Sequence, residues 1–408
     1  MLNAYVTAQQ CDNSAVPLGI YISVPFCRSK CSYCNFASGV FSRGAFESYV
    51  RRVCADIRNA ERTAREAGGA FEREVDSIYL GGGTPTVLEP AQLGEIFAAV
   101  RETFEVMQGA EVTVECAPAS LSDTMLEALL RCGVNRVSLG VQSFVDQESR
   151  AVGRLHTRDA TLVDIERLRR AGVTNINIDL IAGLPHQTQA SWQYSLEQTI
   201  ATGAPHVSVY MLEVDEDSRL GRELIAGGKR YHAHFVPDED TTADLYLIAG
   251  EALEAAGVKQ YEISNFARVG GESLHNLKYW TRQPYMGFGV DAHSMLLSSD
   301  GSRNAVRMGT PDVLEQYTTG APRSVTPVSH DMAVEEEFFL GLRLRRGIDL
   351  ARIAAVYGVH CVPQQVVDEL ESAGLLDREG TWIGLTQRGR LLSNEVFQRF
   401  IRDAVVSE

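Results

Sequence analysis

The chain has 408 residues, a formal net charge of −15, 22% charged residues and 45% hydrophobic residues, which is the composition of an ordinary globular protein of two or three domains. The acidic balance disfavours nucleic acid as a partner, because a negative surface repels phosphate backbones. No run approaches the roughly 20 apolar residues that cross a bilayer. The first residues lack the basic and apolar regions of a signal peptide. We therefore expect a cytoplasmic protein without a transmembrane segment.

Strand-like and helix-like segments alternate from residue 18 to about residue 215. The expected strands are 19–24, 77–82, 111–116, 135–142, 175–183 and 206–212, and helical patterns between them include 46–61, 91–104 and 121–133. This alternation predicts a parallel sheet with right-handed crossovers, and six units predict an open, incomplete (β/α)6 barrel. Several strand runs are nearly all apolar, so we expect strands buried on both faces. Chemistry in such sheets sits at the carboxyl ends of the strands.

The alternation stops after the sixth strand. A mixed α+β extension follows, and from about residue 330 helices precede a short β-ribbon, which predicts a small winged-helix-like domain. Its acidic segment 364–374 disfavours DNA binding. The predicted domains are an N-terminal extension (1–17), an α/β core (18–230), the α+β extension (231–329) and the C-terminal domain (330–408).

Three of the eight cysteines fall within eight residues, directly after the first expected strand. Cys27, Cys31 and Cys34 have the spacing C-x3-C-x2-C. Three thiolates on one loop can each bind one iron of a [4Fe–4S] cubane and leave the fourth iron without a protein ligand. A structural zinc site normally has four ligands, often as two CxxC pairs, and no second pair is present. The spacing therefore favours an iron–sulfur cluster over zinc.

A glycine-rich segment, 81–86, follows the second expected strand. Glycines let the backbone approach a ligand closely and free amide and carbonyl groups to meet its charged ends. Alone, such a segment is most often a tight turn. The cysteine loop follows the first expected strand in the same way, so both segments lie at the same edge of the sheet. We therefore expect this edge to bind a ligand.

The cysteine spacing in this setting resembles the radical S-adenosylmethionine superfamily, and from about residue 18 to 400 the chain is similar to its HemN-like branch. The resemblance implies that Cys27, Cys31 and Cys34 hold the cluster and that S-adenosylmethionine chelates the open iron through its amino and carboxylate groups. It places Tyr21, Gly82 and Glu115 around that molecule. For a second S-adenosylmethionine, found in HemN-like structures, it implies Gly83, Thr84, Gln142, Arg154 and Asp179.

Two features distinguish branches of this family. Coproporphyrinogen oxidases carry a further cysteine two residues after the third, whereas here Asn35 and Phe36 follow Cys34. The segment 275–280 reads HNLKYW, which resembles the HNxxYW signature of HemW-type haem chaperones. Segment 336–349 resembles the C-terminal domain of that branch.

The resemblance makes His275, Asn276, Tyr279 and Trp280 the candidate haem-binding residues. A neutral imidazole is a common axial ligand of haem iron, and aromatic rings offer flat faces to a porphyrin. Arg282 and Lys278 are candidates for the propionates. The alternative is that these side chains only pack the second domain. The eight other histidines lack a comparable sequence setting.

The function implied by the resemblance is a haem chaperone that binds a [4Fe–4S] cluster, S-adenosylmethionine and haem and delivers haem to client apo-haemoproteins, such as respiratory enzymes reached by docking to a partner at the membrane. One alternative is an oxygen-independent coproporphyrinogen III dehydrogenase, which performs a radical oxidative decarboxylation. Another is a HemN-like radical methyltransferase. The sequence favours the chaperone over an enzyme and leaves open whether S-adenosylmethionine is cleaved and whether the chain is a monomer or a homodimer.

Overall fold

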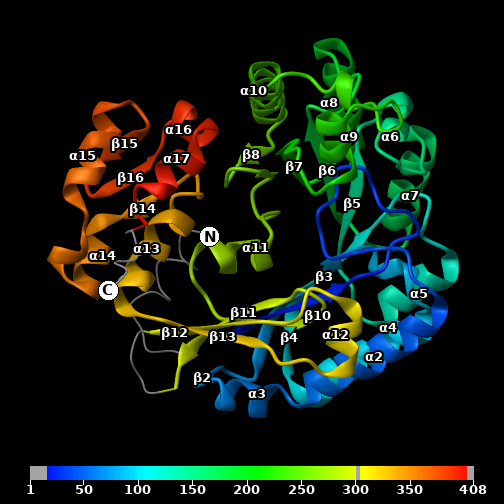
Figure 1. The fold of residues 1–408 in the computed structure, drawn as a ribbon, viewed down its shortest axis with the longest axis horizontal. Helices are drawn as coiled ribbons and strands as arrows, with labels where there is room; N and C mark the ends of the chain where they lie inside the picture. The colour runs from blue at the N-terminus through cyan, green and yellow to red at the C-terminus, as the bar shows by residue number, and fades with distance from the viewer. Residues whose placement is uncertain (1–15, 300–303, 402–408) are drawn as a thin grey trace.

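The computed structural model describes residues 16–299 and 304–401 (Figure 1). The predicted extension 1–17 therefore lies almost entirely outside the described residues, and so does Cys11. The predicted α/β core is confirmed within them. Its parallel strands are β1 (Leu18–Val24), β3 (Glu74–Gly82), β4 (Glu105–Cys116), β5 (Arg136–Gln142), β6 (Asn175–Ala182) and β7 (His206–Met211).

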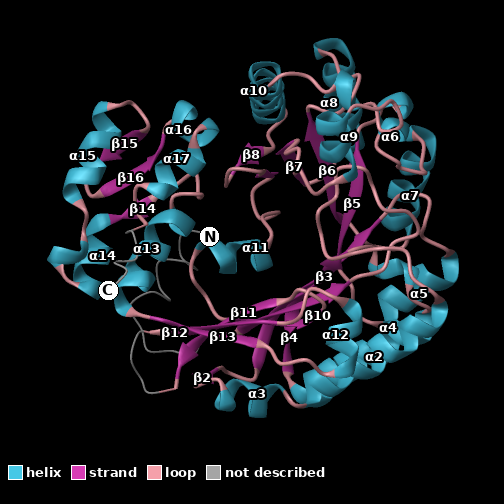
Figure 2. Ribbon diagram, viewed as in Figure 1, coloured by secondary structure: helices cyan, strands magenta, loops and turns pink. Residues whose placement is uncertain are grey.

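Helices connect these strands and cover one face of the sheet (Figure 2). They are α2 (Arg43–Arg58), α3 (Ala60–Glu66), α4 (Pro90–Thr103), α5 (Asp123–Arg131), α6 (Asp146–Ala151), α7 (Arg158–Arg170) and α8 (Gln189–Thr202). The 3-10 turn η1 (Pro85–Val87) follows β3. Helices α4 and α5 are the predicted 91–104 and 121–133, and the predicted 46–61 is divided between α2 and α3 at Asn59. Thus the sequence pattern located the core elements correctly.

The extension adds strands to both sides of the same sheet. Its elements are η2 (Ala233–Phe235), α10 (Glu239–Ala255), β8 (Lys259–Gln260), β9 (Asn265–Ala267), α11 (Leu274–Trp280), β10 (Tyr285–Gly289), β11 (His293–Ser298), β12 (Ala305–Gly309), α12 (Leu314–Thr319) and β13 (Ser324–Val328). The short strand β2 (Gly69–Ala70), which pairs with β11, and helix α9 (Arg219–Ala226) come from the core segment. For the described ranges the strand order is β13-β12-β11-β10-β1-β3-β4-β5-β6-β7-β9-β8. Strand β10 runs parallel to β1. From β10 to β13, each strand is antiparallel to its neighbour. The result is an open, curved sheet.

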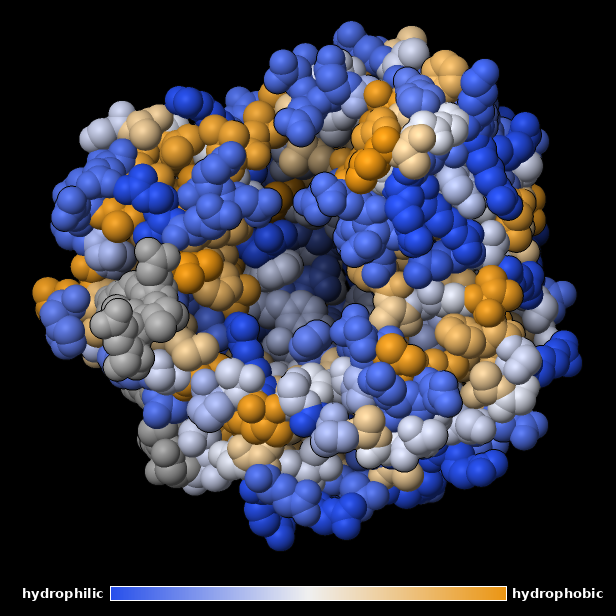
Figure 3. Space-filling view, in the orientation of Figure 1, coloured by the Kyte–Doolittle hydropathy of each residue, from blue (hydrophilic) through white to orange (hydrophobic). Residues whose placement is uncertain are grey.

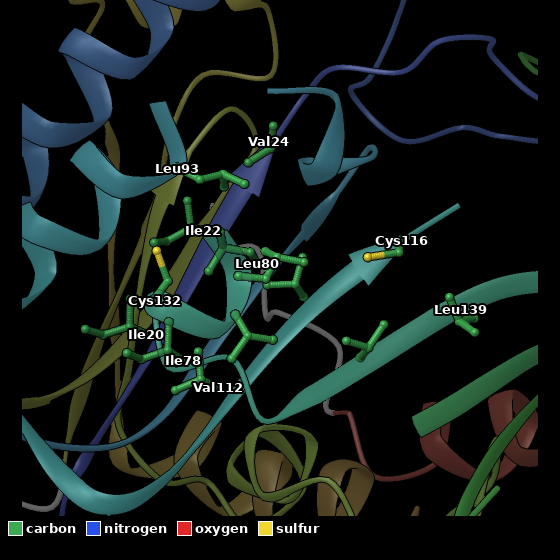
Figure 4. Close-up of a cluster of buried hydrophobic side chains, with 14 of the residues drawn as sticks. Ile20, Ile22, Val24, Ile78, Leu80, Leu93, Val112, Cys116, Cys132 and Leu139 are labelled. Atoms are coloured by element: carbon green, nitrogen blue, oxygen red, sulfur yellow. The ribbon is translucent and has the colours of Figure 1, made fainter. Parts of the chain in front are cut away.

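The core strands are buried on both faces, as expected, but the two faces differ in polarity. Their outward residues are apolar and pack under the helices, as Figure 4 shows for Ile20, Ile22, Ile78, Leu80 and Leu93 of α4. Their inward residues are mostly polar, as described next, because this face surrounds a central space instead of a second layer of helices. The strand segments therefore alternate with period two.

Inward polar residues anchor the short helix α11 inside the curve of the sheet. Glu111 of β4 accepts hydrogen bonds from Ser273 Oγ at 3.2 Å and from the amides of Leu274 and His275 at 3.1 and 3.2 Å. The Lys278 ammonium lies 2.8 Å from Asp76 Oδ1, and its side chain is 2% exposed. A carboxylate at the N-terminus of a helix satisfies free amides and favours its dipole. Helix α11 is therefore fixed at both ends by the core.

The C-terminal domain has its own small sheet, and its apolar core continues into Met295, Ala305 and Val328 of the extension. Its elements are α13 (His330–Gly341), β14 (Ile348–Asp349), α14 (Leu350–Tyr357), η3 (Val359–Cys361), α15 (Gln364–Ser372), β15 (Leu376–Glu379), β16 (Trp382–Leu385), α16 (Gln387–Leu391) and α17 (Ser393–Gln398). The strand order is β14-β16-β15. A helix, a strand, two helices and a ribbon follow in the order of the expected winged-helix-like domain. In Figure 1 it lies across the central space from α7. The described helices include none long and apolar enough to cross a bilayer.

We predict that Gly289→Ala lowers the free energy of unfolding by about 2 kcal/mol or more. Gly289 has a φ of +100°, and a Cβ there would lie 2.1 Å from the Ser23 carbonyl oxygen of the neighbouring strand. The matched control is Gly250→Ala within α10, where the nearest atom lies 3.9 Å from the added Cβ. It should raise stability by about 1 kcal/mol. Anaerobic chemical denaturation measures both, and equal effects would contradict the prediction.

Candidate functional site

The cysteine loop between β1 and α2 is closed at its base by backbone hydrogen bonds. The Cys27 amide donates to the Gly39 carbonyl at 2.8 Å, and the Gly39 amide donates to Pro25 at 2.9 Å. The Cys34 amide donates to the Cys31 carbonyl at 3.4 Å, which makes a turn between these two cysteines. Cys31 is buried and the other two thiols are partly exposed. All three cysteines thus lie on one loop that backbone hydrogen bonds close at the carboxyl end of β1.

Each thiol has a hydrogen-bond donor or hydroxyl near its sulfur. Arg154 Nη1 lies 3.5 Å from Cys31 Sγ, Thr84 Oγ1 lies 3.9 Å from Cys27 Sγ, and Ser38 Oγ lies 3.9 Å from Cys34 Sγ. Burial raises the pKa of the Cys27 thiol, so iron binding there replaces a proton. A nearby cation and hydroxyls suit thiolates that carry negative charge. These donors fit the predicted cluster.

In the described part of the chain, no group of three or more His, Cys, Asp or Glu side chains surrounds a point where a single metal ion would sit. A tetrahedral zinc ion requires its ligands to converge in that way. A cubane takes one thiolate at each of three irons, so its ligands stand apart. The three cysteines remain predicted cluster ligands.

The glycine segment after β3 is pressed against the cysteine loop. The Gly83 amide donates to the Val24 carbonyl at 2.8 Å, and the Thr84 amide donates to the Phe26 carbonyl at 2.7 Å. A Cβ on Gly83 would lie 2.7 Å from the Phe26 carbonyl oxygen. Glycine is therefore needed here for the contact between two loops, in addition to its predicted role toward S-adenosylmethionine.

Two inward acids stand at the ends of β4 and β6. Glu115 accepts a hydrogen bond from the Tyr79 hydroxyl at 2.9 Å, and burial, together with the negative charge of Asp179, raises the Glu115 pKa to about 7. Asp179 accepts from Ser138 Oγ at 2.9 Å and Asn177 Nδ2 at 2.6 Å, and burial raises its pKa. Paired buried carboxylates favour a cationic ligand. The ammonium and sulfonium of S-adenosylmethionine have this charge.

Arg154 and Gln142 lie beside these acids at the end of β5. Arg154 Nη2 donates to the Gly140 carbonyl, and Gly140 is in register with Asp179 on β6. Gln142 has a φ of +68°, and its buried Oε1 has no hydrogen-bond partner in the residues described. The structure thus brings the predicted residues of β1, β3, β4, β5 and β6 to one edge of the sheet. Their contacts with S-adenosylmethionine stay predicted.

A cavity of about 480 Å³ opens beside this edge. Figure 3 shows a hollow in the middle of the molecule. The walls come from β1, β3 and β4, from the cysteine loop, from α11 and the residues after it, from β10 to β12, and from α13. The lining residues are Tyr21, Ser23, Phe36, Ala37, Gly82, Glu115, Tyr279, Trp280, Arg282, Tyr285, Asp291, His293, Met295, Arg307, Glu336 and Leu340. Predicted S-adenosylmethionine residues and predicted haem residues therefore share one cavity.

The HNxxYW segment divides between the cavity and the interior. Tyr279 and Trp280 line the cavity, but His275 and Asn276 do not. His275 is 1% exposed; its Nδ1 lies 3.0 Å from Ser77 Oγ and its Nε2 lies 2.9 Å from the Tyr279 hydroxyl. Burial, with smaller effects of Lys278 and Arg136, lowers the His275 pKa to about 3. His275 thus contacts Ser77 through Nδ1 and Tyr279 through Nε2, and it holds the Tyr279 side chain in place from inside the fold.

Lys278 is turned away from the cavity, contrary to the sequence expectation that it meets propionates. Its Nζ lies 2.7 Å from the Pro17 carbonyl oxygen in addition to its ion pair with Asp76. Arg282 does line the cavity, where its Nε contacts Glu336 of the C-terminal domain. Lys278 is thus structural, while Arg282 remains a candidate for propionates.

Sequence reasoning missed the walls contributed by distant segments. His293 and Met295 of β11, Arg307 of β12 and Glu336 of α13 line the cavity beside the HNxxYW residues. They carry no local motif, and long stretches of chain separate them from the cysteine loop. Only the folded sheet, in which β10 pairs with β1, brings them together.

Comparison with known proteins agrees with this architecture. The family model of the radical SAM superfamily matches residues 21–198, and that of the HemN C-terminal domain matches residues 328–392. The "Heme chaperone HemW" of Bacillus subtilis (strain 168) is 34% identical over 389 residues, which are 93% of this chain and 98% of that protein. This chain belongs to the HemW family. Its C-terminal domain is accordingly a HemN_C domain.

Other members and one solved structure place the family more broadly. The HemW protein of Escherichia coli (strain K12) is 28% identical and covers 95% of this chain and 99% of its own length. The bovine (Bos taurus) mitochondrial "Radical S-adenosyl methionine domain-containing protein 1" is 34% identical over 81% of this chain and 74% of its own length. The structure of coproporphyrinogen III oxidase (HemN) from Escherichia coli has a TM-score of 0.79 at 23% identity, with coverage of 98% and 93%. That likeness establishes the fold.

We predict that Cys34→Ser loses most of the iron and acid-labile sulfide that reconstituted wild type should hold, about four irons per chain. A serine hydroxyl is a poor substitute for a thiolate. The matched control is Cys132→Ala, because Cys132 is a buried cysteine among the apolar side chains of the outward face (Figure 4). Iron and sulfide analysis measures both variants, and an unchanged iron content in Cys34→Ser would refute the cluster assignment.

We predict that Glu115→Gln weakens S-adenosylmethionine binding about tenfold or more at pH 8, because it removes a charge-assisted hydrogen bond to the ammonium. Without ligand the same variant should become more stable relative to the wild type as pH rises. The folded carboxyl ionises near pH 7 and the unfolded one near 4.5, so the wild type loses stability between these values. We expect the difference in unfolding free energy to grow by about 2 kcal/mol from pH 5 to pH 8.

The control for this prediction is Glu127→Gln, which removes an exposed carboxylate of α5 that lies 3.8 Å from Arg131. Calorimetric titration with S-adenosylmethionine and thermal unfolding at both pH values give the readouts. If Glu115→Gln binds like wild type, Glu115 does not hold the ammonium.

Proposed function

We infer that this protein is a haem chaperone. In this proposal Cys27, Cys31 and Cys34 hold a [4Fe–4S] cluster, the edge of the sheet binds S-adenosylmethionine, and the cavity receives haem for delivery to client apo-haemoproteins. The observation that carries the proposal is the cavity itself, which combines aromatic walls with two arginines. The HemW relatives that match over nearly their whole length, named as haem chaperones, support the same function.

The aromatic residues after β9 suit a porphyrin. Tyr279 lies with its ring centroid 4.6 Å from that of Tyr285 and 6.2 Å from that of Trp280, and all three line the cavity. Such rings bury a flat apolar ligand and contact its edge. The volume of about 480 Å³ is within the usual range for cofactor sites.

The polar residues of the cavity suit the propionates. Arg282 and Arg307 both line the cavity, and both pair with the carboxylate of Glu336. Arg307 is 43% exposed, so its guanidinium could also meet a carboxylate ligand.

The remaining groups would act at the sheet edge. Bound at the open iron, S-adenosylmethionine gives the cluster access to radical chemistry. Glu115 and Asp179 would hold the ammonium groups of the first and second molecules, and Arg154 would meet the carboxylate of the second. Tyr21, Gly82, Gly83, Thr84 and Gln142 would complete these sites. We further propose a cytoplasmic protein, monomeric or homodimeric, that reaches membrane-bound respiratory clients through a partner.

We predict that reconstituted wild type binds about one haem per chain in an anaerobic haemin titration, with a saturable Soret shift, and that Trp280→Ala weakens binding about tenfold. The control is Trp382→Ala, since Trp382 is 41% exposed on β16 and does not line the cavity. It should bind like wild type.

The same preparations are then assayed with coproporphyrinogen III and S-adenosylmethionine. No conversion is expected. Absence of saturable haemin binding, together with oxidative decarboxylation of coproporphyrinogen III, would replace the chaperone with the dehydrogenase.

A further inference from the structure

We propose that His293 of β11 is the axial ligand of the haem iron, an assignment that rests on the proposed haem-binding function. The argument begins with the imidazoles available. Among the residues that line the cavity, His293 is the single histidine. Its side chain is 70% exposed, whereas His275 is 1% exposed and bonded at both ring nitrogens. An iron ligand needs an unengaged nitrogen that faces the ligand space.

His293 is held in position by the pairing of β11 with its neighbouring strands. It begins β11 and is paired with Gly309 of β12 in antiparallel register. Its backbone lies against β10, where a Cβ on Gly287 would be 2.2 Å from the His293 carbonyl oxygen. Gly309 lies beside the ring, because a Cβ there would be 3.4 Å from His293 Nδ1, and a larger side chain at this position would cover that nitrogen. Sites built on strands hold a ligand more accurately than loops.

A carboxylate is available to orient the ring. Asp291 Oδ1 lies 3.6 Å from His293 Nε2, and Asp291 also lines the cavity. Its backbone is held in a tight turn with a φ of +54°, and its amide donates to the Pro311 carbonyl at 2.9 Å. Metal-bound histidines usually donate their second ring N–H to a carboxylate or carbonyl. In the proposed site a shorter approach of Asp291 to Nε2 would position the ring and leave Nδ1 as the nitrogen that binds iron.

Other candidate haem contacts lie near His293 on β11 and β12. Met295 shares its face of β11, and Arg307 of β12 is in register with Met295. Arg307 is 43% exposed and its Nη2 lies 2.7 Å from Glu336 Oε1. One wall thus offers an imidazole and a guanidinium, while Tyr279 and Trp280 form another. A porphyrin between these walls would have iron at His293 and a propionate at Arg307.

The test is spectroscopic and uses the full-length, cluster-reconstituted protein with ferric haemin. We expect His293→Ala to lose the wild-type Soret position and ligand-field pattern in electron paramagnetic resonance, and to weaken binding about tenfold. Added imidazole should restore the wild-type spectrum in this variant. Because His293 is exposed, the variant should keep its fold and the iron of its reconstituted cluster. Both are measured before haemin is added.

His360→Ala is the matched control, since it removes an exposed histidine of η3 that does not line the cavity, and it should leave the spectrum unchanged. A wild-type spectrum for His293→Ala would overturn the assignment, as would loss of the axial-ligand signature in Met295→Leu or in His275→Gln with His293 intact. Failure of the wild type to bind haemin would instead defeat the proposed function, and the ligand assignment with it.

Discussion

The curved sheet has two faces of opposite character, and the rest of the structure depends on this. Ile20, Ile22, Ile78 and Leu80 face outward and pack under the helices. The inward side of the same strands carries acids, hydroxyls and glycines, which have to find partners because unpaired buried polar groups are costly. At the amino ends of the strands α11 supplies the partners. At the carboxyl ends of the strands the inward polar groups are available to ligands. The inner face of the sheet therefore has a structural half, at the amino ends, and a candidate binding half, at the carboxyl ends.

Helix α11 connects these two halves. His275 and Lys278 lie on the side that meets β1 and β3, while Tyr279 and Trp280 reach the cavity. His275 and Tyr279 are four residues apart, the spacing at which helical side chains meet. Through their hydrogen bond, the buried His275 fixes the position of Tyr279 in the cavity wall. The HNxxYW segment therefore combines anchoring and lining residues, which explains why its residue types look like a haem site and yet its histidine is internal.

Much of this protein was predictable from the sequence. Local patterns located the six core strands, the cysteine loop and the glycine segment, because hydrophobic periodicity and motif spacing are local properties. The same alternation was visible in segments such as NINIDL and HVSVYM, and reading it strictly would have predicted the polar inner face. The far walls of the cavity were not predictable. His293, Arg307 and Glu336 come from three separate elements, and their convergence depends on the parallel pairing of β10 with β1.

The position of Glu336 has a consequence for synthesis on the ribosome. The cysteines of the loop emerge within the first few dozen residues of the nascent chain, but the cavity lacks its last wall until α13 has left the exit tunnel and Glu336 has met Arg282 and Arg307. Chains fold from the N-terminus as they are made. In the proposed function the cysteine loop could take up its iron before the cavity beside it closes, and an unfinished polypeptide would have no complete pocket for a porphyrin.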